Sequence, residues 1–280
     1  MNLINGFKLM EYAKGKGIVL PCFNTTNYEL TYGIIKGLQN SGRGGYIQIS
    51  SNNLELSSPQ IIVDMVRFAM KDLNVDVPIV LHLDHGKSFD DVKACIDAGF
   101  TSIMIDASHL PLEENIEEVK KVTEYCHYFN IPVEAELGAI GGKEEAEALN
   151  KEGKTNSEDV GLFLEQTNCD LLAVSVGNVH GLAKEPNIDF ELLKEIASVS
   201  TVPLVLHGGS GIPFDDVRKA RGSNLIKVNY GSDLRKVFIS TFGKAYEKNH
   251  NAFDVKSLSK LAIKAVSESV VTISNNINQK

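Results

Sequence analysis

Eight short apolar segments recur along this 280-residue chain, and stretches with helical periodicity separate them. Each segment is too short for a helix and is rich in Val, Ile and Leu, which is typical of buried strands in a parallel sheet. The segments are residues 17–23, 45–50, 77–84, 101–106, 131–137, 170–177, 202–207 and 225–230. Eight strands that alternate with helices over about 250 residues predict an α/β chain folded as a (β/α)8 TIM barrel.

A doubly wound open sheet is the competing α/β fold, but the first segment is not followed by a GxGxxG turn. The stretches between segments look amphipathic and helical. Residues 112–129 are an example, because Ile116, Val119, Val122 and Cys126 fall on one stripe. We therefore expect a single (β/α)8 barrel domain over residues 1–280, with its active site at the C-terminal face of the strands.

The gap between the fifth and sixth segments is longer than the others and contains Gly141-Gly142 followed by a polar run. A long loop with a glycine hinge on a compact barrel often serves as a lid, so we expect a lid near residues 138–159. A solvated acidic helix is the alternative. Residues 254–276 predict a C-terminal amphipathic helix.

Composition excludes some classes of partner. A formal net charge of −8 argues against nucleic acid and against an anionic membrane surface. No apolar stretch reaches the roughly 18 residues of a spanning helix, and the first residues lack the features of a signal peptide. The cysteines Cys22, Cys95, Cys126 and Cys169 stand far apart, which predicts neither disulfides nor a thiolate metal site. We expect a cytoplasmic protein.

The third segment and its end, residues 79–86, concentrate chemistry in one place. His82 and Asp84 share a face of the expected strand, and His85 follows where the strand should give way to a loop. An unpaired buried charge costs several kcal/mol, so a buried strand that ends in Asp-His needs partners there. Chemistry at the C-terminal end of this strand is the first hypothesis.

Polar side chains that suit chemistry lie at the ends of all eight segments. If these ends were merely solvated, we would expect mixtures of Lys, Glu and Gly instead. In a barrel of this class the ends point into one mouth. The residues are Asn24, Ser50, Asp84 with His85, Asp106, Glu136, His180, His207 and Asn229.

Three histidines follow three different strands: His85, His180 and His207. Three imidazoles with one open position are the pattern of a catalytic zinc site. Each histidine alone is more readily explained as a core or capping residue, which is how we interpret His82 and the remaining histidines. The matched positions of the three favour a shared metal ion.

The seventh and eighth segments are followed by loops that suit a phosphate group. Glycines in the run 207–213 let the backbone approach an anion, and the following helix offers unpaired N–H groups. Residues 229–233 supply a second set of donors, and phosphate binding recurs at these two loops in this fold. The candidate residues are Gly208, Gly209, Ser210, Asn229, Gly231 and Ser232. A phosphorylated substrate is therefore expected.

Several stretches together resemble the class II, metal-dependent aldolases that cleave ketose bisphosphates, above all the tagatose/fructose-bisphosphate branch. They are spread over most of the chain and are jointly specific. The stretches are residues 21–24, 81–85, 102–109, 133–138, 177–181, 207–211 and 227–229.

This resemblance implies a lyase that reversibly cleaves a ketose 1,6-bisphosphate (fructose or tagatose) to dihydroxyacetone phosphate and glyceraldehyde 3-phosphate. It implies that His85, His180 and His207 hold Zn²⁺, that Asp84 is the acid/base at the C4 hydroxyl, and that Glu144 exchanges a proton with the enediolate. Glu136 and Asp106 resemble carboxylates that a displaced metal can use. Gly181 joins the phosphate-binding positions. A monovalent cation (Na⁺ or K⁺) beside the phosphate and a homo-oligomer (dimer or tetramer) are also implied.

The chain departs from the family pattern at two places. The relatives usually carry a Tyr two residues after the His-Gly pair, where this chain has Leu182-Ala183, and many carry an Asp-Pro-Arg that here reads Asp254-Val255-Lys256. Lysine keeps a charge but loses the bidentate fork of arginine. The sequence thus leaves open which phosphorylated sugar or sugar acid is cleaved, and whether Lys256 replaces the arginine at the far phosphate.

Three other functions compete with this interpretation. Lys227 lies on the same face as Asn229 and could form a Schiff base, although an ion pair to a neighbouring carboxylate is the simpler explanation. A metal-dependent hydrolase is disfavoured because the first strand has no His-x-His pair. A non-catalytic companion subunit would have no need of Asp84, Glu144 and three histidines together.

Overall fold

A computed structural model describes residues 3–140, 153–182, 186–251 and 253–279. Within these residues, eight strands pair in sequence order and close into a barrel, and each strand is parallel to its neighbours. The strands are β1 (Leu20–Asn24), β2 (Gly45–Ser50), β3 (Ile79–Gly86), β4 (Ser102–Ile105), β5 (Val133–Leu137), β6 (Leu171–Val174), β7 (Leu204–Leu206) and β8 (Leu225–Tyr230). The predicted (β/α)8 fold is confirmed.

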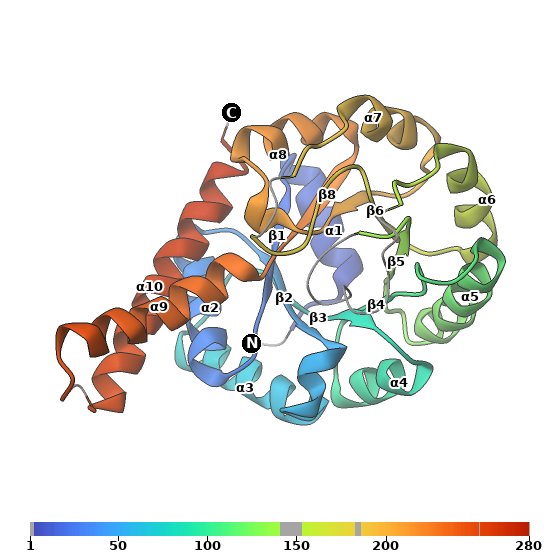
Figure 1. Cartoon of the computed structure of the whole chain (residues 1–280). Coiled ribbons are helices and arrows are strands. Elements are labelled where there is room, and N and C mark those ends of the chain that lie inside the picture. The colour runs from blue at the N-terminus through green and yellow to red at the C-terminus, as the bar shows by residue number, and fades with distance from the viewer. Residues whose placement is uncertain (1–2, 141–152, 183–185, 252, 280) are drawn as a thin grey trace.

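Helices surround the barrel and follow the strands (Figure 1). The α-helices are α1 (Gly6–Lys16), α2 (Tyr28–Ser41), α3 (Pro59–Asp72), α4 (Phe89–Ala98), α5 (Leu112–Tyr128), α6 (Ser157–Thr167), α7 (Phe190–Val199), α8 (Phe214–Ala220), α9 (Ser232–Lys248) and α10 (Val255–Asn276). Three short 3₁₀ helices are η1 (Ser51–Glu55), η2 (Gly209–Gly211) and η3 (Arg221–Ser223).

The interior of the barrel is layered because side chains on a strand alternate between its two faces. At the N-terminal end, Leu9 and Ala13 of α1 pack against Leu20, Tyr46 and Val80, which closes the barrel with an apolar layer. Next to it lies a more polar layer. It contains Cys22, Gln48, His82, Glu134 and Lys227, all fully buried. The next step along the strands brings the polar strand ends to the C-terminal mouth.

The outer face of each strand packs against the surrounding helices in the main apolar core. Helix α10, where the sequence predicts a helix near residues 254–276, lies against α2. Close approach is allowed because Gly33 and Gly37 of α2 face Val266 and Val270 of α10, where a Cβ atom would clash. The ends of α9 and α10 that are joined to each other project beyond the barrel (Figure 1).

The lid and the absence of a membrane span are also predicted from the sequence. Most of the predicted lid near residues 138–159 lies outside the described residues. The flanks that are described meet at one bridge between Ala139 and Gly153. Among the described helices, none is long and apolar enough to cross a membrane.

Candidate metal and substrate site

The rings of His85, His180 and His207 meet at the C-terminal mouth of the barrel. Their centroids are separated by 5.2 Å for His85 and His180, 4.7 Å for His85 and His207, and 5.7 Å for His180 and His207. One ring nitrogen of each lies within 4.8 Å of the others. The structure thus brings together three imidazoles that are distant in the sequence.

His85 lies within β3, whereas the sequence predicts that the strand gives way to a loop at this residue. The register between β3 and β4 shifts between Leu83 and Gly86, and His85 adopts a left-handed backbone with φ 46°. This bulge turns the ring so that Nδ1 lies 2.6 Å from Oδ2 of Asp106 while Nε2 lies 3.0 Å from Nδ1 of His207. Histidines that bind a metal through one ring nitrogen typically have a carboxylate hydrogen-bonded to the other, because the carboxylate fixes the ring's tautomer and orientation.

The electrostatics of His180 and His207 suit a cation. Burial lowers the pKa of His180 to about 3 and also lowers the pKa of His207, so both rings are neutral at pH 7 and have a lone pair to offer. Burial also disfavours charge on His85, but Asp84 and Asp106 outweigh it and raise its pKa well above the usual value. Nε2 of His180 is buried without a hydrogen-bond partner among the described residues. This nitrogen and the surrounding carboxylates fit a bound metal ion.

Asp106 and Glu136 stand beside this cluster, as their positions at strand ends predict. Oγ of Ser108 lies 2.8 Å from Oδ1 of Asp106 and 3.2 Å from Oε1 of Glu136, so its one proton lies between the two carboxylates. His85, Asp106 and Glu136 form a second group whose candidate ligand atoms lie within 4.8 Å of one another. The mouth therefore offers two overlapping sets of ligands that share His85.

Asp84 is 3% exposed and is held from two sides. Nδ2 of Asn24 donates to its Oδ2 at 2.7 Å, and Nδ2 of Asn229 donates to its Oδ1 at 3.2 Å. Burial raises the pKa of Asp84, but the neighbouring cationic groups, His85 first and also Lys227, outweigh burial and bring it below the usual range. Asp84 is therefore an oriented carboxylate beside the histidine cluster.

Lys227 and Glu134 form an ion pair below the cluster, with 2.6 Å between Nζ and Oε2 and no exposure of either side chain. Oε1 of Glu134 lies 2.9 Å from Nε2 of His207, so Glu134 also orients a candidate ligand. The sequence predicts a carboxylate partner for Lys227 without identifying it as Glu134. The spacing of Glu134 and Glu136 could have identified it, since residues two apart on the fifth strand share its inward face.

The loops after β7 and β8 lie beside each other. Gly208 has φ 71°, and a Cβ atom there would clash with the backbone oxygen of Val179. The loop that carries His180 includes Gly181, which has φ 85°. Oγ of Ser210, within η2, accepts from the backbone N–H of Asp233 at 3.1 Å, which ties η2 to the first turn of α9.

The other predicted substrate-binding residues lie close to this junction. Gly231 precedes α9, which begins at Ser232, and a Cβ atom on Gly231 would contact Oδ1 of Asn24. Ser50 is paired in register with Asp84 at the end of β2. The predicted residues thus border one mouth, apart from Glu144, which lies outside the described residues.

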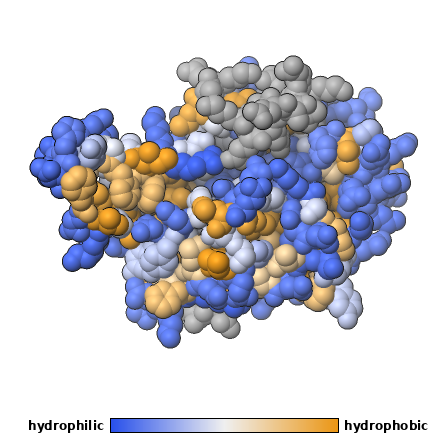
Figure 2. Space-filling model, turned by 60° about the horizontal axis from the view of Figure 1, so that its bottom comes forward, coloured by the Kyte–Doolittle hydropathy of each residue, from blue (hydrophilic) through white to orange (hydrophobic). Residues whose placement is uncertain are grey.

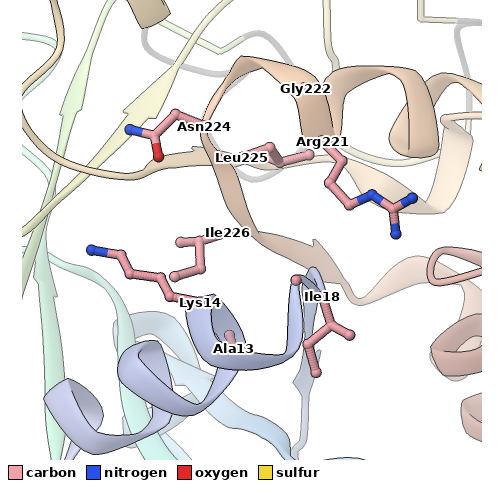
Figure 3. A pocket seen from close by; sticks show the side chains of 9 residues that line it. Ala13, Lys14, Ile18, Arg221, Gly222, Asn224, Leu225 and Ile226 are labelled. Atoms are coloured by element: carbon pink, nitrogen blue, oxygen red, sulfur yellow. The ribbon is translucent and has the colours of Figure 1, made fainter.

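A separate hollow lies near the other end of β8, between α1 and η3 (Figure 3). Leu225 and Ile226 form part of its wall, and Asn229 at the site lies further along the same strand. The charged groups of Lys14 and Arg221 point away from each other in this view. This hollow is distinct from the mouth and does not gather charge at one point.

A (β/α)8 barrel with a candidate metal-ligand cluster and an oriented carboxylate at its mouth is the arrangement expected of a metal-dependent lyase of the class II aldolase type. The chain belongs to the family described as "Fructose-bisphosphate aldolase class-II", whose model matches residues 5–280. Metal dependence is characteristic of that family. The family and the enzyme class predicted from the sequence are confirmed.

Individual relatives agree with the family match. A fructose-bisphosphate aldolase of Staphylococcus epidermidis is 35% identical over 272 residues, which covers 96% of this chain and 95% of the relative. One from Geobacillus stearothermophilus is 34% identical over 260 residues, covering 92% and 91%. Among solved structures, the YdjI aldolase from Escherichia coli K12 superimposes with a TM-score of 0.86 at 27% identity, covering 99% of this chain and 97% of that one.

Proposed function

We propose that this aldolase cleaves fructose 1,6-bisphosphate, or its C4 epimer tagatose 1,6-bisphosphate, to dihydroxyacetone phosphate and glyceraldehyde 3-phosphate, and catalyses the reverse condensation. The observation that supports it best is the convergence of three histidines beside Asp84 in a chain that shares 35% identity with a fructose-bisphosphate aldolase. Chemically, cleavage needs a base at the C4 hydroxyl and stabilisation of the charge left on the enediolate oxygen.

The metal would be Zn²⁺, held by His85, His180 and His207. When bound, the metal would act as a Lewis acid that stabilises the developing enediolate charge by several kcal/mol. Asp106 keeps the ring of His85 in the orientation that presents Nε2. With Glu136, Asp106 also offers a second position that a displaced ion could use.

Asp84 would remove the proton of the C4 hydroxyl in cleavage and return it in condensation. Its lowered pKa keeps the carboxylate ionised, and the two amide donors leave it a single orientation. General acid/base catalysis of this kind contributes typically about 10²–10⁴ in rate. Glu144, outside the described residues, would exchange the second proton with the enediolate.

The phosphate of the dihydroxyacetone half would bind between the loops after β6, β7 and β8. Left-handed backbone at Gly181 and Gly208 exposes N–H groups there, and α9 begins beside them. We assign this role to Gly181, Gly208, Gly209, Ser210, Asn229, Gly231 and Ser232, with Asn24 and Ser50 nearer the reacting carbons. A Na⁺ or K⁺ ion beside the phosphate would reduce charge repulsion there.

A homo-oligomer, a dimer or tetramer, is part of this proposal. Five large apolar side chains of the α9–α10 region are 50–72% exposed: Ile239, Tyr246, Phe253, Val255 and Leu261. Figure 2 shows hydrophobic surface on the arm that projects at the left. An exposed apolar surface of this kind is typical of protein interfaces. A reducing compartment such as the cytoplasm fits the four cysteines, which are all buried and unpaired.

The test is release of triose phosphate from fructose 1,6-bisphosphate, tagatose 1,6-bisphosphate and related phospho-ketoses, with and without a chelator. We expect activity that chelation abolishes and zinc restores. If the zinc-loaded protein cleaves a different phosphorylated sugar, the assignment to these two ketoses is wrong. The exposed Leu182 and Lys256, where the relatives usually differ, would then be the first residues to exchange.

A further inference from the structure

A continuous chain of hydrogen bonds runs from Cys22 to Asp84 across three neighbouring strands, β1, β2 and β3. The thiol of Cys22 contacts Oε1 of Gln48. Nε2 of Gln48 donates to Oδ1 of Asn24 at 2.9 Å, and Nδ2 of Asn24 donates to Oδ2 of Asp84 at 2.7 Å. We call these three hydrogen bonds the donor chain. Cys22 and Gln48 are fully buried, so water does not compete for these bonds.

The direction of the donor chain is fixed from its end at Asp84. An ionised carboxylate only accepts hydrogen bonds, so Asn24 must turn its NH₂ group toward Asp84 and its oxygen toward Gln48. Gln48 must then present its NH₂ group to Asn24 and its oxygen to Cys22. The last acceptor needs a donor, and the thiol proton of Cys22 supplies it.

We infer that Cys22 is a positioning residue for this aldolase: its thiol proton fixes the amide orientation of Gln48, which fixes Asn24, which holds Asp84 in place. The inference rests on the role proposed for Asp84. It assigns Cys22 no contact with substrate or metal.

The groups around Oε1 of Gln48 identify the thiol of Cys22 as its hydrogen-bond donor. Burial raises the pKa of Cys22 well above its usual value, which keeps the proton on sulfur. Lys227 is the nearby alternative donor, but its Nζ is bound to Oε2 of Glu134 at 2.6 Å and lies 3.3 Å from Nε2 of His82. The strand register supports the geometry, since Asn24 is paired with Gln48 and Cys22 is two residues earlier on the same face.

Removal of the thiol proton would leave Oε1 of Gln48 buried without its donor, so the carboxylate of Asp84 alone would hold the amides of Asn24 and Gln48 in their orientation. Asn24 and Asp84 would then be less firmly positioned. A single neutral hydrogen bond is worth about 0.5–1.5 kcal/mol. We therefore expect Cys22→Ala to lower kcat by about two- to tenfold.

The experiment compares Cys22→Ala and Cys22→Ser with Cys95→Ala as the matched control. Cys95 is a fully buried cysteine of α4, outside the barrel, and its replacement leaves a hole of the same size. In zinc-loaded enzyme we expect Cys22→Ala to lower kcat while KM and bound metal stay unchanged. Cys22→Ser should restore kcat because its hydroxyl donates a hydrogen bond. Cys95→Ala should keep the parental kcat. If Cys22→Ala folds poorly, Cys22→Val fills the volume without a donor and should reproduce the loss.

Infrared spectroscopy of the S–H stretch tests the contact without any assay. The band that disappears in Cys22→Ala should lie below the band that disappears in Cys95→Ala, since the thiol of Cys22 donates to Gln48 whereas the thiol of Cys95 has no side-chain acceptor among the described residues. Parental kcat in Cys22→Ala and Cys22→Val, or equal losses in Cys22→Ala and Cys22→Ser, would overturn the inference. So would an S–H band of Cys22 at the position of a free thiol. Failure of the proposed function would look different, because the parent enzyme itself would then cleave none of the ketoses.

Discussion

Nζ of Lys227 lies 2.6 Å from Oε2 of Glu134, and neither side chain has any exposed surface. The pair sits in the barrel one layer below the histidine cluster, and Glu134 also contacts His207. Burial disfavours charge on both groups, but the surrounding charges outweigh it, so the pKa of Lys227 is raised and that of Glu134 is lowered. The ion pair therefore joins the core of the barrel to the mouth.

We expect Lys227→Met to destabilise the fold strongly, because it leaves the carboxylate of Glu134 buried without its counter-charge. Removal of one partner of a buried pair typically costs about 3–5 kcal/mol. Urea unfolding gives the free energy directly, and the double variant Lys227→Met with Glu134→Gln should recover part of the loss. A single variant as stable as the parent would show that the pair is not formed.

The same pairing predicts that Lys227 does not form a Schiff base. An ammonium group lacks the lone pair that attacks a carbonyl, and its raised pKa keeps the proton on nitrogen. Borohydride added with fructose 1,6-bisphosphate should leave the mass of the intact protein unchanged. A covalent adduct mapped to the peptide of Lys227 would instead place this enzyme among the Schiff-base aldolases.

The stability of the fold should fall below pH 6.5 partly through His82. Burial lowers the pKa of His82 to about 3, so the folded state leaves this ring neutral while the unfolded chain protonates it near pH 6.5. The folded pKa lies below the unfolded one, so the contribution is fully present above pH 6.5 and is lost as the pH falls toward 3. Between pH 7.5 and pH 5 the loss amounts to about 2 kcal/mol.

The measurement is urea unfolding of metal-loaded parent and His82→Gln at both pH values. The variant should lose less stability on acidification than the parent, whatever its absolute stability. His250, which lies on the surface, provides the control, and His250→Gln should keep the parental pH dependence. If His82→Gln and the parent respond alike, the ring is not buried in its neutral form.

The order of the strands and the gathering of three histidines follow from the sequence alone, because both depend on local features. Short apolar runs rich in Val, Ile and Leu mark the strands, and the residue after each run reaches the mouth in any barrel of this class. The role of Glu134 and the donor chain from Cys22 could not be predicted in the same way. They depend on the register between strands, such as the pairing of Cys22 with Asn229 of β8, which no local pattern specifies.

The strand ends were also less predictable than the strands. The sequence predicts that the third strand gives way to a loop at His85, but the bulge between β3 and β4 carries the strand on to Gly86 and puts His85 at φ 46°. A positive φ at a residue other than glycine is maintained only when the surroundings impose it. Here the contacts of the ring with Asp106 and His207 provide that constraint, and both lie far away in the sequence.

Gly208→Ala should impair the phosphate loop, whereas Gly222→Ala should be tolerated. Gly208 has φ 71° and no room for a Cβ atom beside the backbone of Val179, while a Cβ atom on Gly222 would have nothing within 4 Å. The left-handed backbone alone costs about 1–2 kcal/mol for a residue other than glycine. Thermal unfolding and KM for the bisphosphate should both change for Gly208→Ala only. Parental KM in that variant would remove Gly208 from the phosphate site.

Variants of Asp84 and His180 should affect catalysis and metal binding separately. Asp84→Asn keeps the size of the side chain, but its amide cannot take a proton and accepts from only one of Asn24 and Asn229, so kcat should fall by about 10²–10⁴. Bound zinc per chain, measured on the purified protein, should stay at the parental level because Asp84 is not a proposed ligand. His180→Ala should instead lose zinc, since Nε2 of His180 has no other partner in the described part of the chain. Loss of zinc from Asp84→Asn would make Asp84 a ligand, and the base at the C4 hydroxyl would then have to be another residue.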